Sequence, residues 1–418
     1  MTGAWSWIAS WCIVLLISGL VFKSAALLAM GLPYLVFTLF PLWRSLPKAD
    51  WSTERSHDPS RIVAGQSCDI EIRITNSAEN LAEVYLSDQL PPGLSPQGAW
   101  EYRGECRTGQ SITLRYTVHG RRGKYKFPGL TASVTDPLGL NRRDEIIICP
   151  GTLAILPAVP MIEKVRISPR RTRVFTGLIR SRESGPGIEF LGTRPFVNGD
   201  PSRHINWKAS ARWDTVITNL FEQERIADIG MVLDARKVAE VSNADESLFE
   251  YSIQAAAALA RYFLGMGNRV GLLIYGSYIH WTIPGYGKRQ ADRMMSALTD
   301  AELGEHAVFK EFYHLPSRLF PPESQVVLVS PLRREDVAPL QRLRALGYHV
   351  LIISPDPIVF EQRMLPPDRV RDVAERFTRM ERIVILAKLR RVGIQVVDWD
   401  VSLPLQVALA RAAIRKRK

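Results

Sequence analysis

The stretch Asp228-Ile-Gly-Met-Val-Leu-Asp234 is a short apolar run of the kind that forms a fully buried strand. Four further runs of this kind follow it, and helix-length segments separate them. The expected strands are 269–275, 325–330, 349–354 and 394–399, and the expected helices are 245–264, 287–303, 334–346, 371–392 and 403–415. Alternation of this order predicts an α/β doubly wound parallel sheet with helices on both faces. Residues 278–283 are expected to add a small antiparallel edge.

Folds of this class bind ligands at the carboxyl ends of their strands. The side chains expected there are Asp234, Ser330, Ser354, Asp398 and Asp400. A divalent cation would need several oxygen ligands at one place, but Arg236 and Lys237 follow Asp234 and can neutralise its carboxylate without a metal. The sequence therefore predicts neither a metal nor another cofactor here.

Enzyme motifs are also missing from the sequence. It contains no G-x-x-x-x-G-K-[ST] loop, no G-x-S-x-G elbow and no H-E-x-x-H pair. We therefore expect no catalytic residues and a protein that is not an enzyme.

The preceding region, residues 61–157, has short alternating runs separated by turn residues. Cys68, Ile70, Ile72 and Ile74 would lie on one face of a half-buried strand. Several short strands at this spacing predict an antiparallel β-sandwich of immunoglobulin-like type.

The N-terminus contains two uncharged runs, 4–22 and 24–43, with Lys23 between them. At about 1.5 Å per residue each run is roughly 30 Å long as a helix, the thickness of a bilayer core. The sequence therefore predicts a transmembrane helical hairpin over 4–43, with a buried soluble hairpin as the alternative. Arg44 and Lys48 outnumber Lys23, which favours a cytoplasmic position for the soluble domains.

Composition adds weaker constraints. Lys and Arg exceed Asp and Glu to give a net charge of +12, which permits contact with phosphates or with a bilayer of anionic lipid. The four cysteines show no C-x-x-C spacing, so a disulfide scaffold is not expected and a reducing compartment is the simpler interpretation.

Residues 158–224 form an expected basic connector that leads into the α/β domain of residues 225–418. Within it, the Gly199–Arg212 passage combines turn residues with arginines and a large aromatic residue. The candidate docking residues are Gly199, Asp200, Arg203, Trp207 and Arg212. Two alternatives stay open: the passage binds a partner, or Asp200 caps a helix and pairs with Arg203 while Trp207 packs in the core.

The same passage resembles the family called domain of unknown function 58. The residues that carry the resemblance are Gly185-Pro-Gly-Ile-Glu-Phe190, Gly199-Asp-Pro-Ser-Arg-His-Ile-Asn-Trp207, Ala211-Arg212 and the strand that ends at Asp234. Gly120-Arg-Arg-Gly-Lys-Tyr125 and Asp136-Pro-Leu-Gly-Leu140 match the pattern of the family's β-domain, and the paired apolar runs at the N-terminus complete it.

The resemblance implies a membrane-anchored protein with a von Willebrand factor A-like domain, working beside a MoxR-type AAA+ ATPase. That fold usually holds a metal through D-x-S-x-S, whereas this chain has Asp234, Arg236 and Val238 at those positions. Asp234 would then be a remnant of a lost metal site.

The leading hypothesis is a non-enzymatic adaptor that helps the ATPase to assemble or mature client proteins. The alternatives are a membrane-associated hydrolase that uses Asp200, His204 and Asp234, and a basic nucleic-acid-binding protein.

Overall fold

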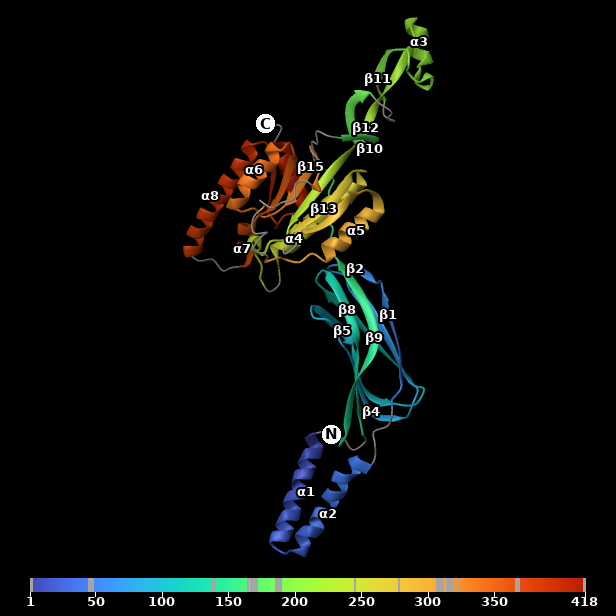
Figure 1. Cartoon of the computed structure of the whole chain (residues 1–418), viewed down its shortest axis with the longest axis vertical. Coiled ribbons are helices and arrows are strands. Elements are labelled where there is room, and N and C mark those ends of the chain that lie inside the picture. Colours follow the sequence, from blue (N-terminus) through green and yellow to red (C-terminus); the bar gives the residue numbers. More distant parts are fainter. Residues whose placement is uncertain are drawn as a thin grey trace. The chain divides into compact units, whose positions relative to one another are not determined.

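The structure, a computed structural model, describes residues 3–43, 49–136, 140–163, 165, 172–184, 190–243, 246–276, 279–305, 312, 319–321, 323–364 and 369–415. The chain divides into two compact units, Met1–Leu156 and Pro157–Lys418 (Figure 1). Some residues used above lie outside the described ranges: Arg44, Lys48, residues 137–139, residues 185–189, residue 245 and residue 278.

The N-terminal helical hairpin is present. Helices α1 (Gly3–Val21) and α2 (Ala25–Trp43) run antiparallel and are joined at Lys23, whose φ of 47° gives the tight turn. The helices approach closely where Gly19 faces α2, because a Cβ at that position would lie 2.9 Å from the Leu28 side chain. Within the described residues, no helix combines the length and apolarity that crossing a membrane requires.

The rest of the first unit consists of two sheets. One has the order β1-β3-β7-β5 and the other β2-β9-β8-β4-β6, and every pair is antiparallel except β2 with β9. The strands are β1 (Trp51–Asp58), β2 (Arg61–Val63), β3 (Cys68–Asn76), β4 (Leu81–Asp88), β5 (Leu94–Ala99), β6 (Glu101–Cys106), β7 (Ser111–Gly120), β8 (Gly123–Thr135) and β9 (Arg142–Leu156).

The buried faces of these two sheets form one apolar core. The alternation predicted for 68–74 is confirmed, since Cys68, Ile70, Ile72 and Ile74 are all buried on β3. Alternation works here because successive side chains of a strand point to opposite faces of the sheet.

A buried ion pair links the two sheets through this core. Arg55 of β1 donates through Nη1 and Nη2 to both carboxylate oxygens of Asp88 on β4, at 2.8 and 2.6 Å. Its Nε donates to the Cys149 carbonyl on β9 at 3.2 Å, and Tyr116 of β7 donates to Asp88. The pair is satisfied on all sides, as a buried pair must be to offset desolvation.

The second unit contains the predicted parallel sheet, with the order β14-β13-β12-β15-β16-β17. All neighbours are parallel except β13 and β14, so the expected antiparallel edge is also present. The strands are β10 (Thr172–Ser184), β11 (Phe190–Pro195), β12 (Ile217–Asp234), β13 (Arg269–Tyr275), β14 (Ile279–Gly285), β15 (Gln325–Val329), β16 (His349–Pro355) and β17 (Gln395–Trp399).

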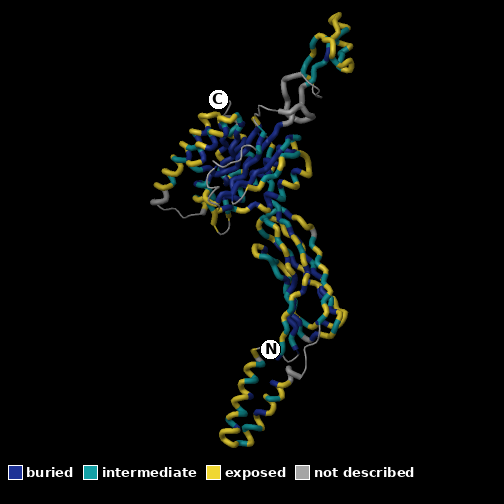
Figure 2. Tube along the Cα trace, viewed as in Figure 1, coloured by how far each residue is buried: buried dark blue, intermediate teal, exposed yellow. Residues whose placement is uncertain are grey.

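Helices cover both faces of this sheet (Figure 2). Side chains of α4, α5 and α9 pack with one face, and those of α6 and α8 pack with the other. The helices of this unit are α3 (Trp207–Trp213), α4 (Leu248–Gly265), α5 (Gly287–Thr299), α6 (Val337–Ala345), α7 (Pro357–Met364), α8 (Arg369–Arg391) and α9 (Leu405–Arg415), with 3₁₀ turns η1 (Ser202–His204), η2 (Lys237–Ala239) and η6 (Arg334–Asp336).

Strand β12 differs from its prediction. It begins at Ile217 rather than at Asp228, and its first part leaves the parallel sheet to pair antiparallel with β10 and β11. The connector predicted over 158–224 therefore contains strands β10 and β11 and the first part of β12. The β11–α3 segment lies at the far end of this extension from the parallel sheet (Figure 1).

Candidate functional site

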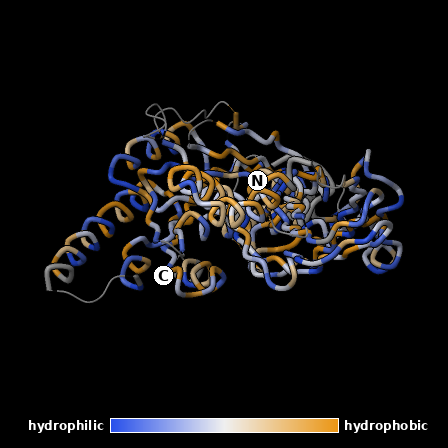
Figure 3. The backbone as a smooth tube through the Cα atoms, turned by 90° about the horizontal axis from the view of Figure 1, so that it is seen from below, coloured by the Kyte–Doolittle hydropathy of each residue, from blue (hydrophilic) through white to orange (hydrophobic). Residues whose placement is uncertain are grey.

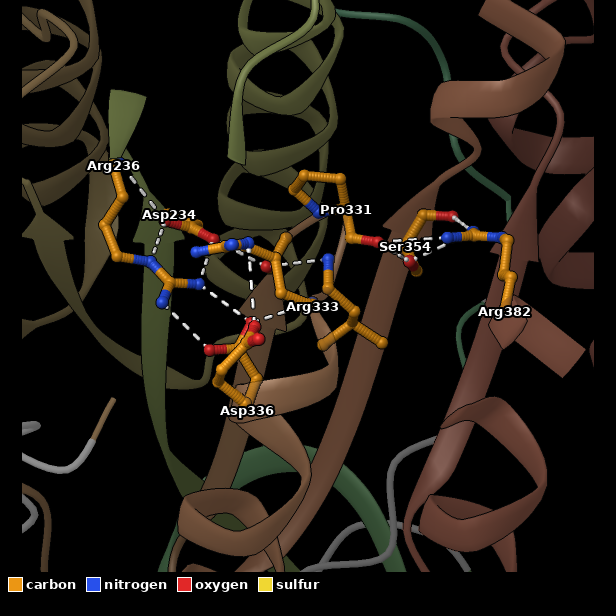
Figure 4. A network of polar contacts seen from close by, with 10 residues as sticks. Asp234, Arg236, Pro331, Arg333, Asp336, Ser354 and Arg382 are labelled. Carbon is orange, nitrogen blue, oxygen red and sulfur yellow. Dashed lines mark hydrogen bonds and ion pairs between the residues drawn. The ribbon is translucent and has the colours of Figure 1, made fainter. Parts of the chain in front are cut away.

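The carboxyl end of β12 contains a buried charge cluster built around Arg236 (Figure 4). The Arg236 guanidinium donates to Asp234 from Nε and Nη2, both at 2.8 Å. It also donates to Asp336 from Nη1 at 2.8 Å and from Nη2 at 2.9 Å. Ser330 Oγ adds a 2.6 Å hydrogen bond to Asp234, and the guanidinium carbon lies 3.8 Å from the centre of the Phe312 ring.

Position in the fold explains how these groups meet. Asp234 ends β12 and Ser330 follows β15, which are neighbouring parallel strands, so both side chains reach the same edge of the sheet. Asp336 lies in the η6 turn after β15 and also accepts the backbone N–H of Arg333 at 2.9 Å. Two carboxylates therefore converge on one point, which is the arrangement that would otherwise attract a divalent cation.

Arg236 supplies the positive charge at that point. Its side chain is 2% exposed and those of Asp234 and Asp336 are 0% exposed, so the attraction acts with little solvent screening. Burial raises the pKa of Asp336, and the hydrogen bond and charge of Arg236 oppose that rise. Burial would lower the pKa of Arg236, but the charges and hydrogen bonds of Asp234 and Asp336 together outweigh burial, so the pKa is raised. The guanidinium therefore stays protonated.

A second buried arginine lies at the same edge of the parallel sheet, beside the carboxyl ends of β16 and β17. Arg382 of α8 donates to Asp398 at 2.6 Å, to the Ser354 carbonyl at 3.2 Å and to the Pro331 carbonyl at 3.0 Å. Asp356 lies 3.6 Å from the Arg382 Nε. Of the side chains expected at the strand ends, Ser354 and Asp398 thus contact Arg382, while Asp400 accepts from Ser402 in its own turn.

The described residues contain no group of three or more His, Cys, Asp or Glu side chains that could hold a metal ion. Arg236, which the resemblance aligns with the second D-x-S-x-S position, forms ion pairs with Asp234 and Asp336.

Glu240 directly follows the η2 turn and lies beside this cluster. Its carboxylate accepts a 2.6 Å hydrogen bond from Ser247 Oγ and lines a small cleft with Asp234 and Arg236. Burial raises the pKa of Glu240 to about 7, against the opposing hydrogen bonds from Ser247 and the Phe249 backbone. Sequence reasoning missed this group because nothing in its local sequence marks it as buried.

The Gly199–Arg212 passage forms the far end of the β12 extension. Asp200 accepts the Val197 backbone N–H at 3.0 Å and pairs with Arg194 at 2.7 Å. The alternative in which Asp200 caps a helix and pairs with Arg203 is therefore wrong, since Asp200 pairs with Arg194 and the cap of α3 is Asn206. Gly199 has a φ of 109°, a conformation that favours glycine and lets the chain turn here.

Asn206 is the N-cap residue of α3. Its side-chain oxygen accepts the Ala209 N–H at 3.0 Å, and its amide donates to Asn219 on β12 at 2.9 Å. The His204 ring packs edge-on against Phe221, with 4.9 Å between the ring centres. These contacts hold the Gly199–Arg212 passage against β12, and the Trp207 side chain takes part in none of them.

Trp207 is therefore not a core residue, contrary to one of the two alternatives. Its side chain is 70% exposed, and Trp213 at the other end of α3 is 73% exposed. Arg203, Lys208 and Arg212 are exposed as well. We call the five residues Arg203, Trp207, Lys208, Arg212 and Trp213 the tip surface.

The three residues of the hydrolase hypothesis do not converge. Asp200 and His204 belong to the tip passage, whereas Asp234 is buried at the other end of β12. Ile205 pairs with Thr218, and the strand from Thr218 to Asp234 covers about 50 Å at about 3.3 Å per residue.

The family described as "Protein of unknown function DUF58" has a model that matches residues 192–354. This range includes the tip surface and the Arg236 cluster, and the match supports the resemblance found in the sequence. No curated protein matches the chain.

Similar solved structures each match about a quarter of this chain. They include a FixG-related protein from Vibrio parahaemolyticus (12% identity, 25% of this chain, 95% of that chain, TM-score 0.18). They also include the CARDB domain of the PF1109 protein from Pyrococcus furiosus, in complex with di-metal ions (10%, 27%, 90%, 0.19). A third is a non-cellulosomal cohesin from Archaeoglobus fulgidus (13%, 25%, 91%, 0.18). Similarity at this level supports no inference about the present chain.

The Arg236 cluster predicts how the protein responds to divalent cations. Millimolar Mg²⁺ should leave the melting temperature of the wild-type chain unchanged, because Arg236 occupies the point between the carboxylates. Arg236→Ala should lower the free energy of unfolding by about 3–5 kcal/mol, since it leaves two buried carboxylates without a cation. Mg²⁺ should then restore part of this loss, about 2.7 kcal/mol at a hundredfold excess over Kd.

Arg236→Lys is the matched control, because it keeps a positive charge and should gain nothing from Mg²⁺. A rise in the wild-type melting temperature with Mg²⁺, removed by Asp234→Ala, would contradict this account.

Glu240 predicts a pH dependence of stability. Its pKa is raised in the folded chain from the usual 4.5 to about 7, so the folded state holds the proton more tightly than the unfolded state. The resulting stabilisation is complete below about pH 4.5 and is lost as the pH rises to 7. Between pH 5 and 8, the wild-type chain should therefore lose more unfolding free energy than Glu240→Gln does, by roughly 1–2 kcal/mol after allowing for solvent screening. Equal losses in chemical denaturation would refute the raised pKa.

Proposed function

We propose that this chain is a non-enzymatic, membrane-anchored adaptor that uses the tip surface to dock a MoxR-type AAA+ ATPase. In this proposal the first unit is an immunoglobulin-like sandwich behind a membrane hairpin, and the second is a von Willebrand factor A-like domain. The ATPase acts with it on client proteins. The observation that carries the proposal is the exposure of Trp207 and Trp213 among three cations, on a passage that hydrogen bonds of Asn206 hold to β12.

The tip surface has the properties of a binding surface. Trp and Arg are the residue types that most often dominate the energy of protein interfaces. A fold gains nothing from leaving two indole rings mostly in water, and apolar side chains grouped in this way are typical of interaction sites. The contacts of Asp200 and Asn206 order the passage beforehand, which lowers the entropy lost when a partner binds.

The cations select the kind of partner surface. Arg203, Lys208 and Arg212 would meet carboxylates, and the guanidinium groups can bind them through two parallel hydrogen bonds. The proposal therefore expects an acidic patch with an apolar centre on the ATPase.

The closed edge of the parallel sheet also supports an adaptor. Arg236 and Arg382 occupy the strand ends where a fold of this class would normally bind a small ligand. Binding capacity in the described part of this unit lies instead on exposed side chains.

Membrane anchoring is supported by the outward faces of α1 and α2. Many apolar side chains there are more than half exposed, including Trp11, Ile13, Val14, Ile17 and Leu20 on α1. Surrounding these side chains with lipid removes them from water, and two adjacent helices satisfy their own backbone groups in a bilayer. We place the soluble parts in the cytoplasm, following the excess of cations after the second helix.

The docking proposal predicts a separation of binding from stability. Trp207→Ala and Arg203→Ala should each weaken binding to a purified MoxR-type ATPase, by roughly 30-fold for Trp207 as a typical interface hot spot. Neither should shift the melting temperature by more than a few degrees, because both side chains are exposed. The affinity is measured by passing the ATPase over the detergent-solubilised full chain immobilised on a sensor surface.

Tyr286→Ala is the matched control, since Tyr286 is a 64% exposed aromatic residue at the start of α5. It should bind the ATPase as the wild type does. Unchanged binding of Trp207→Ala would remove the tip surface from the proposal, and salt-sensitive capture of RNA by the same surface would favour the nucleic-acid alternative.

A further inference from the structure

Helix α8 has two opposite faces, and only one of them packs on the domain. Arg382, Leu386 and Leu389 face inward and are at most 7% exposed. They hold the helix by contacts with Asp398 and with the apolar core on that side of the sheet. The contacts of the inward face are enough to hold α8 on the domain, and the side chains of its outward face are not needed for this.

The outward face is an apolar stripe. Val373, Phe377, Met380 and Val384 follow one another at spacings of four, three and four residues, which places them in one row along the helix. They are 69%, 73%, 66% and 50% exposed. Apolar turns recur along α8 at the left of Figure 3. The row lies about 170° around the helix from the inward-facing Arg382, so it points away from the domain.

Cations border this stripe on both sides. By the 100° step of a helix, Arg376 precedes the row by about 60° and Lys388 follows it by a similar angle. Both side chains are exposed. Over its whole length α8 carries eight Lys and Arg residues against three Asp and Glu residues, a net charge of +5.

We infer that the outward face of α8 lies on an anionic lipid bilayer, with its apolar stripe in the headgroup region and its cations among the phosphates. A helix with one apolar face and a basic border binds membranes in this way. The convex single row of side chains suits a flat, deformable surface, and each cation adds attraction to anionic lipid.

A second copy of the chain is the less favourable occupant. Pairing two α8 helices through their stripes would bring two net charges of +5 together, and like charges repel. An acidic amphipathic helix from another protein would match the charge, and it is an outcome of the test below. The inference does not depend on the docking role of the tip surface.

The test uses the full chain in vesicles of phosphatidylcholine alone or mixed with phosphatidylglycerol. A polarity-sensitive fluorophore is attached at Phe377→Cys, and the four native cysteines are buried, so labelling is directed to the new thiol. Brominated lipid quenches a fluorophore that lies in the bilayer. We expect quenching and a blue shift with the anionic mixture, little of either in phosphatidylcholine, and neither at an Arg293→Cys control on the exposed face of α5.

The charge contribution is tested in the same assay. Arg376→Gln with Lys388→Gln should reduce the membrane-bound population of α8 about fivefold for each cation removed. The matched control is Lys288→Gln with Arg289→Gln, two exposed cations on α5, which should leave the quenching unchanged.

A further label at Ile17→Cys on α1 separates this inference from the anchoring proposal. Quenching at α1 without any at Phe377→Cys in either lipid would overturn the role of α8 and leave the anchor intact. Quenching at Phe377→Cys without any at α1 would support α8 and contradict the anchor. A blue shift at Phe377→Cys that needs an added acidic protein, or that rises with chain concentration rather than with anionic lipid, would also overturn the inference.

Discussion

The second unit depends on one buried interaction, in which the Arg236 guanidinium bridges the carboxylates of Asp234 and Asp336. Parallel strands bring acidic and polar side chains to a common edge, and two carboxylates with no exposed surface cannot both stay ionised there without a cation. An arginine of the same chain supplies that cation. Because its planar group has several fixed donors, it also sets the position of the η6 turn against β12.

Neutralising these carboxylates with an arginine instead of a metal changes what the sheet edge can bind. A metal at such an edge can exchange and can share a coordination position with a partner, whereas a guanidinium fixed by four hydrogen bonds offers none. Arg382 occupies the neighbouring strand ends, and we propose that recognition relies on exposed features instead. The tip surface and the outward face of α8 are two such features, and each joins apolar side chains to cations. They differ in form, since one is centred on the short helix α3 with an indole ring at each end, and the other is a long row of side chains along α8.

Much of the fold could be predicted from sequence, and the site only in part. The parallel strands were found because each is an apolar run of strand length. The first part of β12 was missed, because residues 217–227 mix polar and charged side chains with apolar ones and do not form the continuous apolar run of a buried strand. The sequence suggested Arg236 as a neutralising group because it lies two residues from Asp234. Asp336 could not be assigned, since 100 residues separate it from Arg236 and the η6 turn brings it back. The exposure of Trp207 was likewise not predictable from the sequence, because large aromatic residues are usually well buried and only the structure shows that this side chain is 70% exposed.

The central claim, that Arg236 and Asp336 act as one bridged unit with Asp234, is tested most directly by a double-mutant cycle. Arg236→Met, Asp336→Leu and the double variant are compared with the wild type by chemical denaturation of the full chain. The account predicts that the double variant loses less unfolding free energy than the sum of the single variants, with a coupling of about 2–3 kcal/mol. Additive losses, within about 0.5 kcal/mol, would show that the two residues do not depend on each other and would contradict the account.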